Sequence, residues 1–94
     1  MIAKTAKKQF VSAKPEQYFW VWNGSVLKNM RELRDAMHVM SEAQFTHHVT
    51  REKNDFATWV SEVLGDAKCA KELAKAKLRE TTIQILEKAL KEYQ

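Results

Sequence analysis

Residues 54–65 read Asn-Asp-Phe-Ala-Thr-Trp-Val-Ser-Glu-Val-Leu-Gly, and this stretch decides the fold class. Asn54 and Asp55 suit the N-cap and first turn of a helix, where amide and acidic side chains bind free backbone N–H groups. Gly65 suits the left-handed residue that ends a helix. Large apolar residues between these signals recur at intervals of three and four, as on one buried helical face: Phe56, Trp59, Val60, Val63 and Leu64. The stretch therefore predicts a helix packed against a core.

Two further helices are predicted before this stretch. Residues 29–32 have the Asn-x-x-Glu form of a capping box, and residues 41–44 have the usual form beginning with Ser. Each box is followed by apolar residues at helical spacing. The side chains expected to face the core are Met30, Leu33, Met37, Phe45 and Val49.

After Gly65, Asp66 is expected to cap a fourth helix whose small apolar residues allow close packing. Residues 81–84 read Thr-Thr-Ile-Gln, which would begin a separate last helix at that point. No Gly or Pro separates the two segments, so one long bent helix is the alternative. The predicted inward residues are Ala67, Ala70, Leu73 and Ala74, then Ile83, Leu86, Leu90 and Tyr93.

Residues 18–22, Tyr-Phe-Trp-Val-Trp, have the aromatic density of a half-buried strand, and Asn23-Gly24 indicates a turn after them. A short helix between Pro15 and Gly24 is the alternative. We favour the strand, in which Phe19 and Val21 face one side, and Tyr18, Trp20 and Trp22 face the other. A strand needs a partner, for which residues 10–11 across a turn at Pro15 are the candidate.

The 94 residues are enough for one domain. We expect a flexible basic tail over residues 1–9 and a single helical domain over residues 10–94. The predicted fold is mainly all-α: a compact orthogonal array of four to five short helices preceded by a short extended aromatic segment.

The formal net charge of +4 is concentrated at the ends of the chain. Residues 1–28 carry five Lys against one Glu, and residues 66–94 carry seven basic against five acidic residues. The centre, residues 29–65, carries four basic against six acidic residues. A protein that holds phosphates in its main groove usually shows the reverse.

The single cysteine, Cys69, excludes an internal disulfide and is consistent with a reducing cytoplasm. No apolar run approaches the ~20 residues that cross a bilayer. The lysines near the N-terminus are not followed by the apolar segment of a secretory signal. We therefore expect a cytoplasmic protein that does not bind a membrane.

No motif indicates catalysis or metal binding. The candidate ligands His38, His47, His48 and Cys69 do not have CxxC, HxxxH or HExxH spacing. His48, Glu52 and Asp55 would share a helical face only if one helix ran through Asn54, which reads as a cap. We expect Cys69 to be a packing residue and His47 to be exposed. We expect His48 to be a partly buried, hydrogen-bonded residue that fixes the turn before Asn54. The predictions are no enzyme activity, no cofactor and no metal.

Protein association is the favoured function. A domain of this size has difficulty burying both sides of the aromatic strand, so exposed aromatics would form a surface for a protein partner or for self-association. The candidate contact residues are Trp20, Trp22, His47, His48 and Asp55. The alternative is accessory nucleic-acid binding through basic residues of the tail and the fourth helix: Lys4, Lys7, Lys8, Lys68, Lys71 and Lys75.

An ordered set of motifs resembles an uncharacterised family of short helical prokaryotic domains, many of them archaeal. The motifs are Asn23-Gly24, Asn29-x-x-Glu-Leu33, Phe45-x-x-His-Val49, Asn54-Asp-Phe-x-x-Trp-Val60 and Leu64-Gly-Asp66, within residues 18–75. This chain has Cys69-Ala70 where the family usually has Leu-Ala, and Leu78 stands where a Ser or Thr cap is expected. The resemblance implies a helical domain found alone or attached to other domains, and it implies no reaction.

Overall fold

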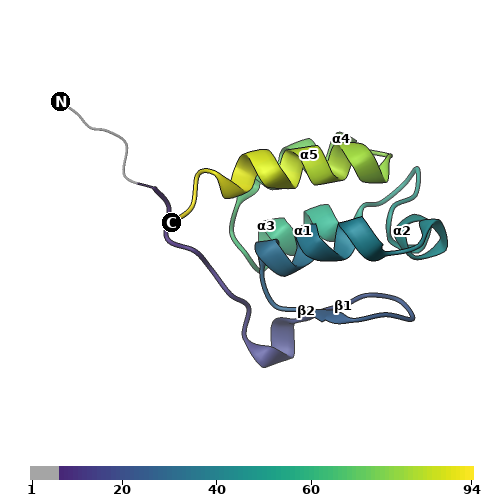
Figure 1. Cartoon of the computed structure of the whole chain (residues 1–94), viewed down its shortest axis with the longest axis horizontal. Helices are drawn as coiled ribbons and strands as arrows, with labels where there is room; N and C mark the ends of the chain where they lie inside the picture. Colours follow the sequence, from purple (N-terminus) through teal and green to yellow (C-terminus); the bar gives the residue numbers. More distant parts are fainter. Residues whose placement is uncertain (1–6) are drawn as a thin grey trace.

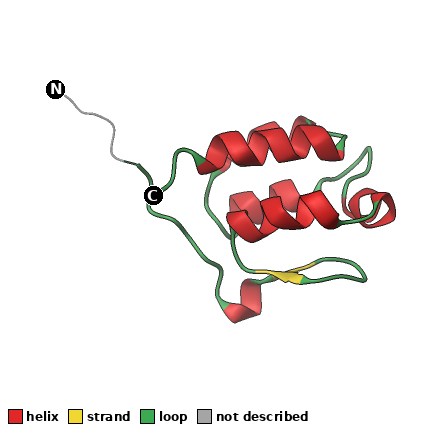
Figure 2. Ribbon diagram, in the orientation of Figure 1, coloured by secondary structure: helices red, strands yellow, loops and turns green. Residues whose placement is uncertain are grey.

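Five α-helices and one short β-hairpin make up residues 7–94, the part of the chain that the computed structural model describes (Figure 1). The protein is mainly α-helical, with a short two-stranded antiparallel segment before the helices (Figure 2). The elements are a 3-10 turn η1 (Pro15–Gln17), β1 (Phe19–Trp20), β2 (Val26–Leu27), α1 (Met30–Val39), α2 (Glu42–His48), α3 (Asp55–Glu62), α4 (Ala67–Lys75) and α5 (Arg79–Leu90).

The helices pack as pairs above the hairpin. α3 lies against α4, α1 lies against α5, and α4 and α5 also contact each other. In Figure 1 the hairpin lies below the α-helices, α1 and α3 form the middle tier, and α5 and α4 form the upper tier. The short α2 lies beyond the end of α1, on the side of the hairpin loop. This position brings α2 side chains to the hairpin.

The core is built on α3, as the stretch at residues 54–65 predicts. Phe56 and Val60 are fully buried, and Trp59 and Leu64 are also buried. The Asn54 side chain accepts a hydrogen bond from the Ala57 N–H and so caps the helix. Gly65 has φ +74°, the left-handed conformation expected after the helix.

The other predicted helix starts are also present. The Asn29 side chain accepts from the Glu32 N–H, and Ser41 and Gln44 form a complete capping box at α2. Asp66 caps α4 by accepting from the Cys69 N–H. Cys69 is buried in the core, as expected for a packing residue.

The second half of the chain differs from prediction in two respects. Ala67 and Ala74 were expected to face the core but are exposed, because the buried face of α4 runs through Cys69, Ala70 and Leu73. The last two helices are separate, and the last one begins at Arg79 rather than at residues 81–84. Leu78 is its N-cap residue and provides no side-chain bond.

The aromatic segment forms a strand, but its partner is not residues 10–11. β1 pairs with β2 in the register Phe19↔Leu27 and Trp20↔Val26. Pro15 begins the 3-10 turn η1 rather than a hairpin turn. The chain instead reverses at residues 22–24, where the Gly24 N–H donates to the Val21 carbonyl. The expected alternation is present: Phe19 and Val21 are buried, whereas Trp20 and Trp22 are exposed.

The two ends of the described chain lie side by side (Figure 1). The Lys8 N–H donates to the Glu92 carbonyl, and the Gln94 N–H donates to the Lys8 carbonyl. Lys8 was assigned to the basic tail from sequence, and these bonds join it to the end of the helical domain. Residues 1–6 of the predicted tail lie outside the described part, and for them the tail stays a prediction.

Candidate interaction surface

The turn between β1 and β2 presents Trp22 at the surface. Its backbone is closed by bonds from the Gly24 N–H to the Val21 carbonyl and from the Val21 N–H to the Ser25 carbonyl. Asn23 has φ +53°, a left-handed conformation that Asn adopts more readily than most residues. The predicted turn is therefore present, and Asn23 rather than Gly24 occupies its left-handed position.

Gln44 of α2 holds the turn from one side. Its Nε2 amide donates to the Trp22 carbonyl at 3.2 Å and to the Asn23 carbonyl at 3.0 Å. Its Oε1 meanwhile accepts from the Ser41 N–H, which completes the capping box. A Cβ atom at Gly24 would lie 2.7 Å from Gln44 Nε2, so any other residue at this position would displace the Gln44 amide.

His48 of α2 holds the same turn through its ring. The Trp22 N–H donates to His48 Nε2 at 2.9 Å. The other ring nitrogen, Nδ1, lies 2.9 Å from Asp55 Oδ2. Because Nε2 accepts a bond, the neutral ring carries its proton on Nδ1 and donates it to Asp55. Both ring nitrogens of this buried histidine are thus used, as the sequence predicts for a hydrogen-bonded His48.

Asp55 reaches His48 without sharing a helix with it. α2 ends at His48, and an antiparallel bridge between Val49 and Asn54 returns the chain to the start of α3. The Lys53 ammonium also contacts Asp55 Oδ2, at 3.0 Å. Burial opposes ionisation of Asp55, but the hydrogen bonds from His48 and Lys53 outweigh burial and hold its pKa below the usual range.

Trp20, Trp22 and His47 form the exposed part of this region, which we call the aromatic surface. Trp20 is 72% exposed and Trp22 is 46% exposed. The His47 ring stacks on Trp22 with ring centroids 4.8 Å apart and planes 10° apart. The structure therefore brings together Trp22, His47, His48 and Asp55 among the predicted contact residues. Trp20 lies on β1 and faces outward.

The His48–Asp55 pair resembles the base and orienting acid of a hydrolase, but its geometry is different. A catalytic histidine offers its free nitrogen to a nucleophile or to substrate. Here the Trp22 N–H already occupies that nitrogen, and the ring is buried. The pair as it stands holds a backbone turn.

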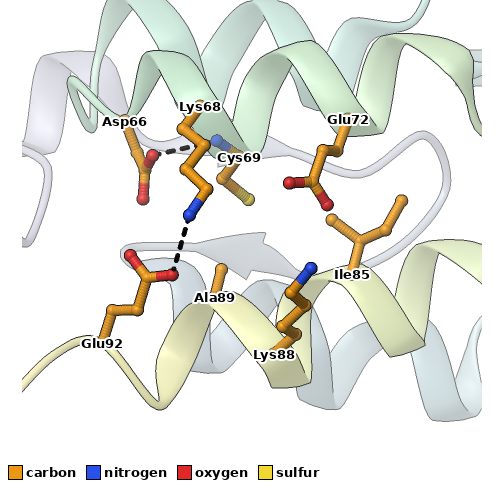
Figure 3. A pocket seen from close by; sticks show the side chains of 8 residues that line it. All are labelled: Asp66, Lys68, Cys69, Glu72, Ile85, Lys88, Ala89 and Glu92. Carbon is orange, nitrogen blue, oxygen red and sulfur yellow. Dashed lines mark hydrogen bonds and ion pairs between the residues drawn. The ribbon is translucent and has the colours of Figure 1, made fainter.

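A small hollow between α4 and α5 lies next to Cys69 (Figure 3). Its volume is about 10 Å³, room for about one water molecule. Burial raises the pKa of the Cys69 thiol to about 12, so the reactive thiolate is scarce at neutral pH. Over residues 7–94, no three His, Cys, Asp or Glu side chains are grouped to hold a metal ion.

The predicted nucleic-acid residues are only partly brought together. Lys8 and Lys68 both contact the Glu92 carboxylate, at 3.2 and 3.3 Å (Figure 3 shows the Lys68 contact). Lys8 also lies 3.6 Å from Asp66. Lys7 is exposed, as are Lys71 and Lys75 on α4. Lys4 lies outside the described residues.

The sequence did not identify Gln44 as part of the site. The sequence predicts Gln44 only as the last residue of a capping box, in which its amide oxygen accepts a hydrogen bond. The remaining NH₂ group of such a glutamine is free to bind a neighbouring segment. That unused donor was the available signal, but it does not indicate which segment the amide binds.

The chain was compared with family models, with curated proteins and with solved structures, and none of them matches it. The family resemblance drawn from the motifs thus stays a prediction. Within residues 7–94, none of the helices has the length and apolar character needed to span a bilayer.

Proposed function

We propose that this chain is a small non-enzymatic module for protein interaction that binds its partner through the aromatic surface. The observation that carries the proposal is the exposure of Trp20 and Trp22 on a hairpin that α2 holds in place. Tryptophan is among the residues most enriched at the energetic centres of protein interfaces. Trp22 loses little conformational freedom on binding, because its ring stacks on His47 and its backbone is bonded to His48.

Trp59 supplies an internal reference for this interpretation. It is buried, it packs against Phe19, and its indole N–H donates to the Gln17 carbonyl at 2.8 Å. Trp59 thus belongs to the core, whereas Trp20 and Trp22 lie outside it. Their exposure supports a role in binding rather than in packing.

Binding assays with matched variants test the proposal. The full chain is used to capture proteins from cells of its source, and self-association is measured by sedimentation equilibrium. Trp20→Ala and Trp22→Ala are compared with Leu78→Ala, which removes a side chain 65% exposed on the α4–α5 connector. We expect a partner, or a second copy, whose affinity falls at least about tenfold in the tryptophan variants only. Binding that is equal in all four proteins would contradict the proposal.

Nucleic-acid binding is the second candidate, and the exposure of Lys7, Lys71 and Lys75 favours it. Glu92 and Asp66 neutralise part of the neighbouring positive charge, which weighs against it. A gel-shift titration with duplex DNA and RNA at about 50 mM salt distinguishes the two candidates. A shift that weakens with salt and with Lys71→Gln plus Lys75→Gln would support this second function.

A further inference from the structure

The hydrogen bonds of His48 are compatible with only one form of its ring. Nε2 must be unprotonated to accept the Trp22 N–H, and Nδ1 must carry a proton to donate to Asp55. Imidazole is the side chain that ordinarily changes charge in the physiological pH range. The bond that holds the hairpin turn therefore depends on the protonation state of this ring.

We propose that His48 is a pH-sensitive latch, in which protonation of Nε2 breaks the bond to the Trp22 amide and loosens the hairpin turn from α2. A protonated ring carries an N–H on both nitrogens. Trp22 N and His48 Nε2 are now 2.9 Å apart. Two nitrogen atoms that both carry a hydrogen repel each other at that distance, because neither can accept a bond. The ring or the turn must move.

The surroundings of His48 determine which bond breaks. Asp55, at the start of α3, attracts the imidazolium and keeps its bond to Nδ1. Lys53, from the connector before α3, contacts the same carboxylate oxygen and weakens that attraction. Phe19 and Phe56 pack against the ring with centroids 5.0 and 5.2 Å away. The aspartate bond persists, and the backbone bond to Trp22 is lost.

His47 is a further titratable group facing this region. Its ring lies 4.9 Å from the His48 ring and stacks on Trp22. A positive charge on His47 would be attracted to the Trp22 ring and would oppose release of the turn. Gln44 still donates to the Trp22 and Asn23 carbonyls, so release is local. The domain stays folded while the turn gains freedom.

The latch does not depend on the proposed function, because it is a property of the free chain. If the aromatic surface binds a partner, acid would weaken that binding by disordering Trp22. The experiment is therefore done without any partner, and failure of the latch leaves the binding proposal intact.

Solution NMR of the ¹⁵N-labelled full chain tests the latch directly. His48 Nε2 is followed as the pH is lowered stepwise from about 7.5 until the ring is protonated or the chain unfolds. Amide hydrogen exchange of Trp22, corrected for intrinsic exchange, is compared with that of Ala70, whose N–H is bonded within α4. Once the Nε2 signal reports a protonated ring, we expect the protection of Trp22 to fall about tenfold, while that of Ala70 is unchanged.

Two variants separate His48 from its neighbour. His48→Gln keeps one acceptor and one donor but does not titrate, so Trp22 protection should no longer depend on pH. His47→Gln should leave the wild-type response in place. If His48→Gln does not fold, coincidence of the His48 and Trp22 titrations in the wild-type chain decides the question. Trp22 protection that survives protonation of His48, or that falls only together with that of Ala70, would overturn the latch.

Discussion

The α3–α4 pair and the hairpin turn are both held by side-chain amides, but in different surroundings. Asn54 is buried; its Oδ1 accepts from the Ala57 N–H, and its Nδ2 donates to the Leu73 carbonyl at 2.8 Å. It thus joins the start of α3 to the end of α4 inside the core. Gln44 makes equivalent bonds to the hairpin turn, where water can replace them. Similar bonds therefore maintain the fold in one region and the position of a surface residue in the other.

The largest expected difference between the two regions comes from their aromatic residues. Phe56→Ala removes a fully buried ring and should lower the free energy of unfolding by about 3–5 kcal/mol. Trp20→Ala removes a ring that is 72% exposed and should change it by about 0.5 kcal/mol or less. Urea denaturation of both variants measures the contrast. A Trp20→Ala loss comparable with that of Phe56→Ala would mean that Trp20 belongs to the core.

Sequence predicts the α3 region well because its signals are local. A cap, an apolar face and a left-handed glycine all lie within residues 54–65, and each appears in the structure. The error at α4 has a different origin. Alanine is small enough to be placed on either side of a helix, so Ala67 and Ala74 carried little information about which side faces inward. Large residues such as Leu73 determine that choice.

A second expected effect concerns Asp66, a buried carboxylate in the helical region. Burial opposes its ionisation, but bonds from the Tyr93 hydroxyl and the Cys69 N–H, together with Lys8, hold its pKa below the ordinary 3.8. A carboxyl with a lowered pKa in the folded state stabilises the protein above its ordinary pKa. That stabilisation is lost as the pH falls through the lowered value.

Asp66→Asn should therefore destabilise the chain by about 1–3 kcal/mol at neutral pH, since a charged hydrogen-bond acceptor is lost. The difference from wild type should begin to shrink below about pH 4, where Asp66 of the unfolded wild-type chain becomes protonated, and should disappear only below the lowered pKa of the folded chain. Denaturation midpoints measured across this range give the result. Asp35→Asn is the matched control, because Asp35 is exposed and, among residues 7–94, its ion pair is with the adjacent Arg34. A difference that is constant with pH would show that Asp66 is not the responsible group.

The candidate site was predicted in part, for a physical reason. Alternation along residues 18–22 predicts that Trp20 and Trp22 face outward, because neighbouring residues of a strand face opposite sides. Contacts between distant segments have no such local signal. The bond from Trp22 to His48 spans 26 residues, and the pairing of β1 depends on where the chain turns. The sequence thus indicated most residues of the candidate site, but neither Gln44 nor the contacts that join them.

The smallest expected effect tests whether the hairpin turn behaves as a local unit. Gly24→Ala places a methyl group 2.7 Å from Gln44 Nε2, so the amide must withdraw from the Trp22 and Asn23 carbonyls. We expect a loss of about 1 kcal/mol or less, because the displaced groups can bind water. Gln44→Ala removes the obstructing amide, so Gly24→Ala in that background should cost less than in wild type. A double-mutant cycle should then give a coupling of about 0.5 kcal/mol or more. Additive losses would show that Gly24 and Gln44 act independently, so that the turn does not depend on their close approach.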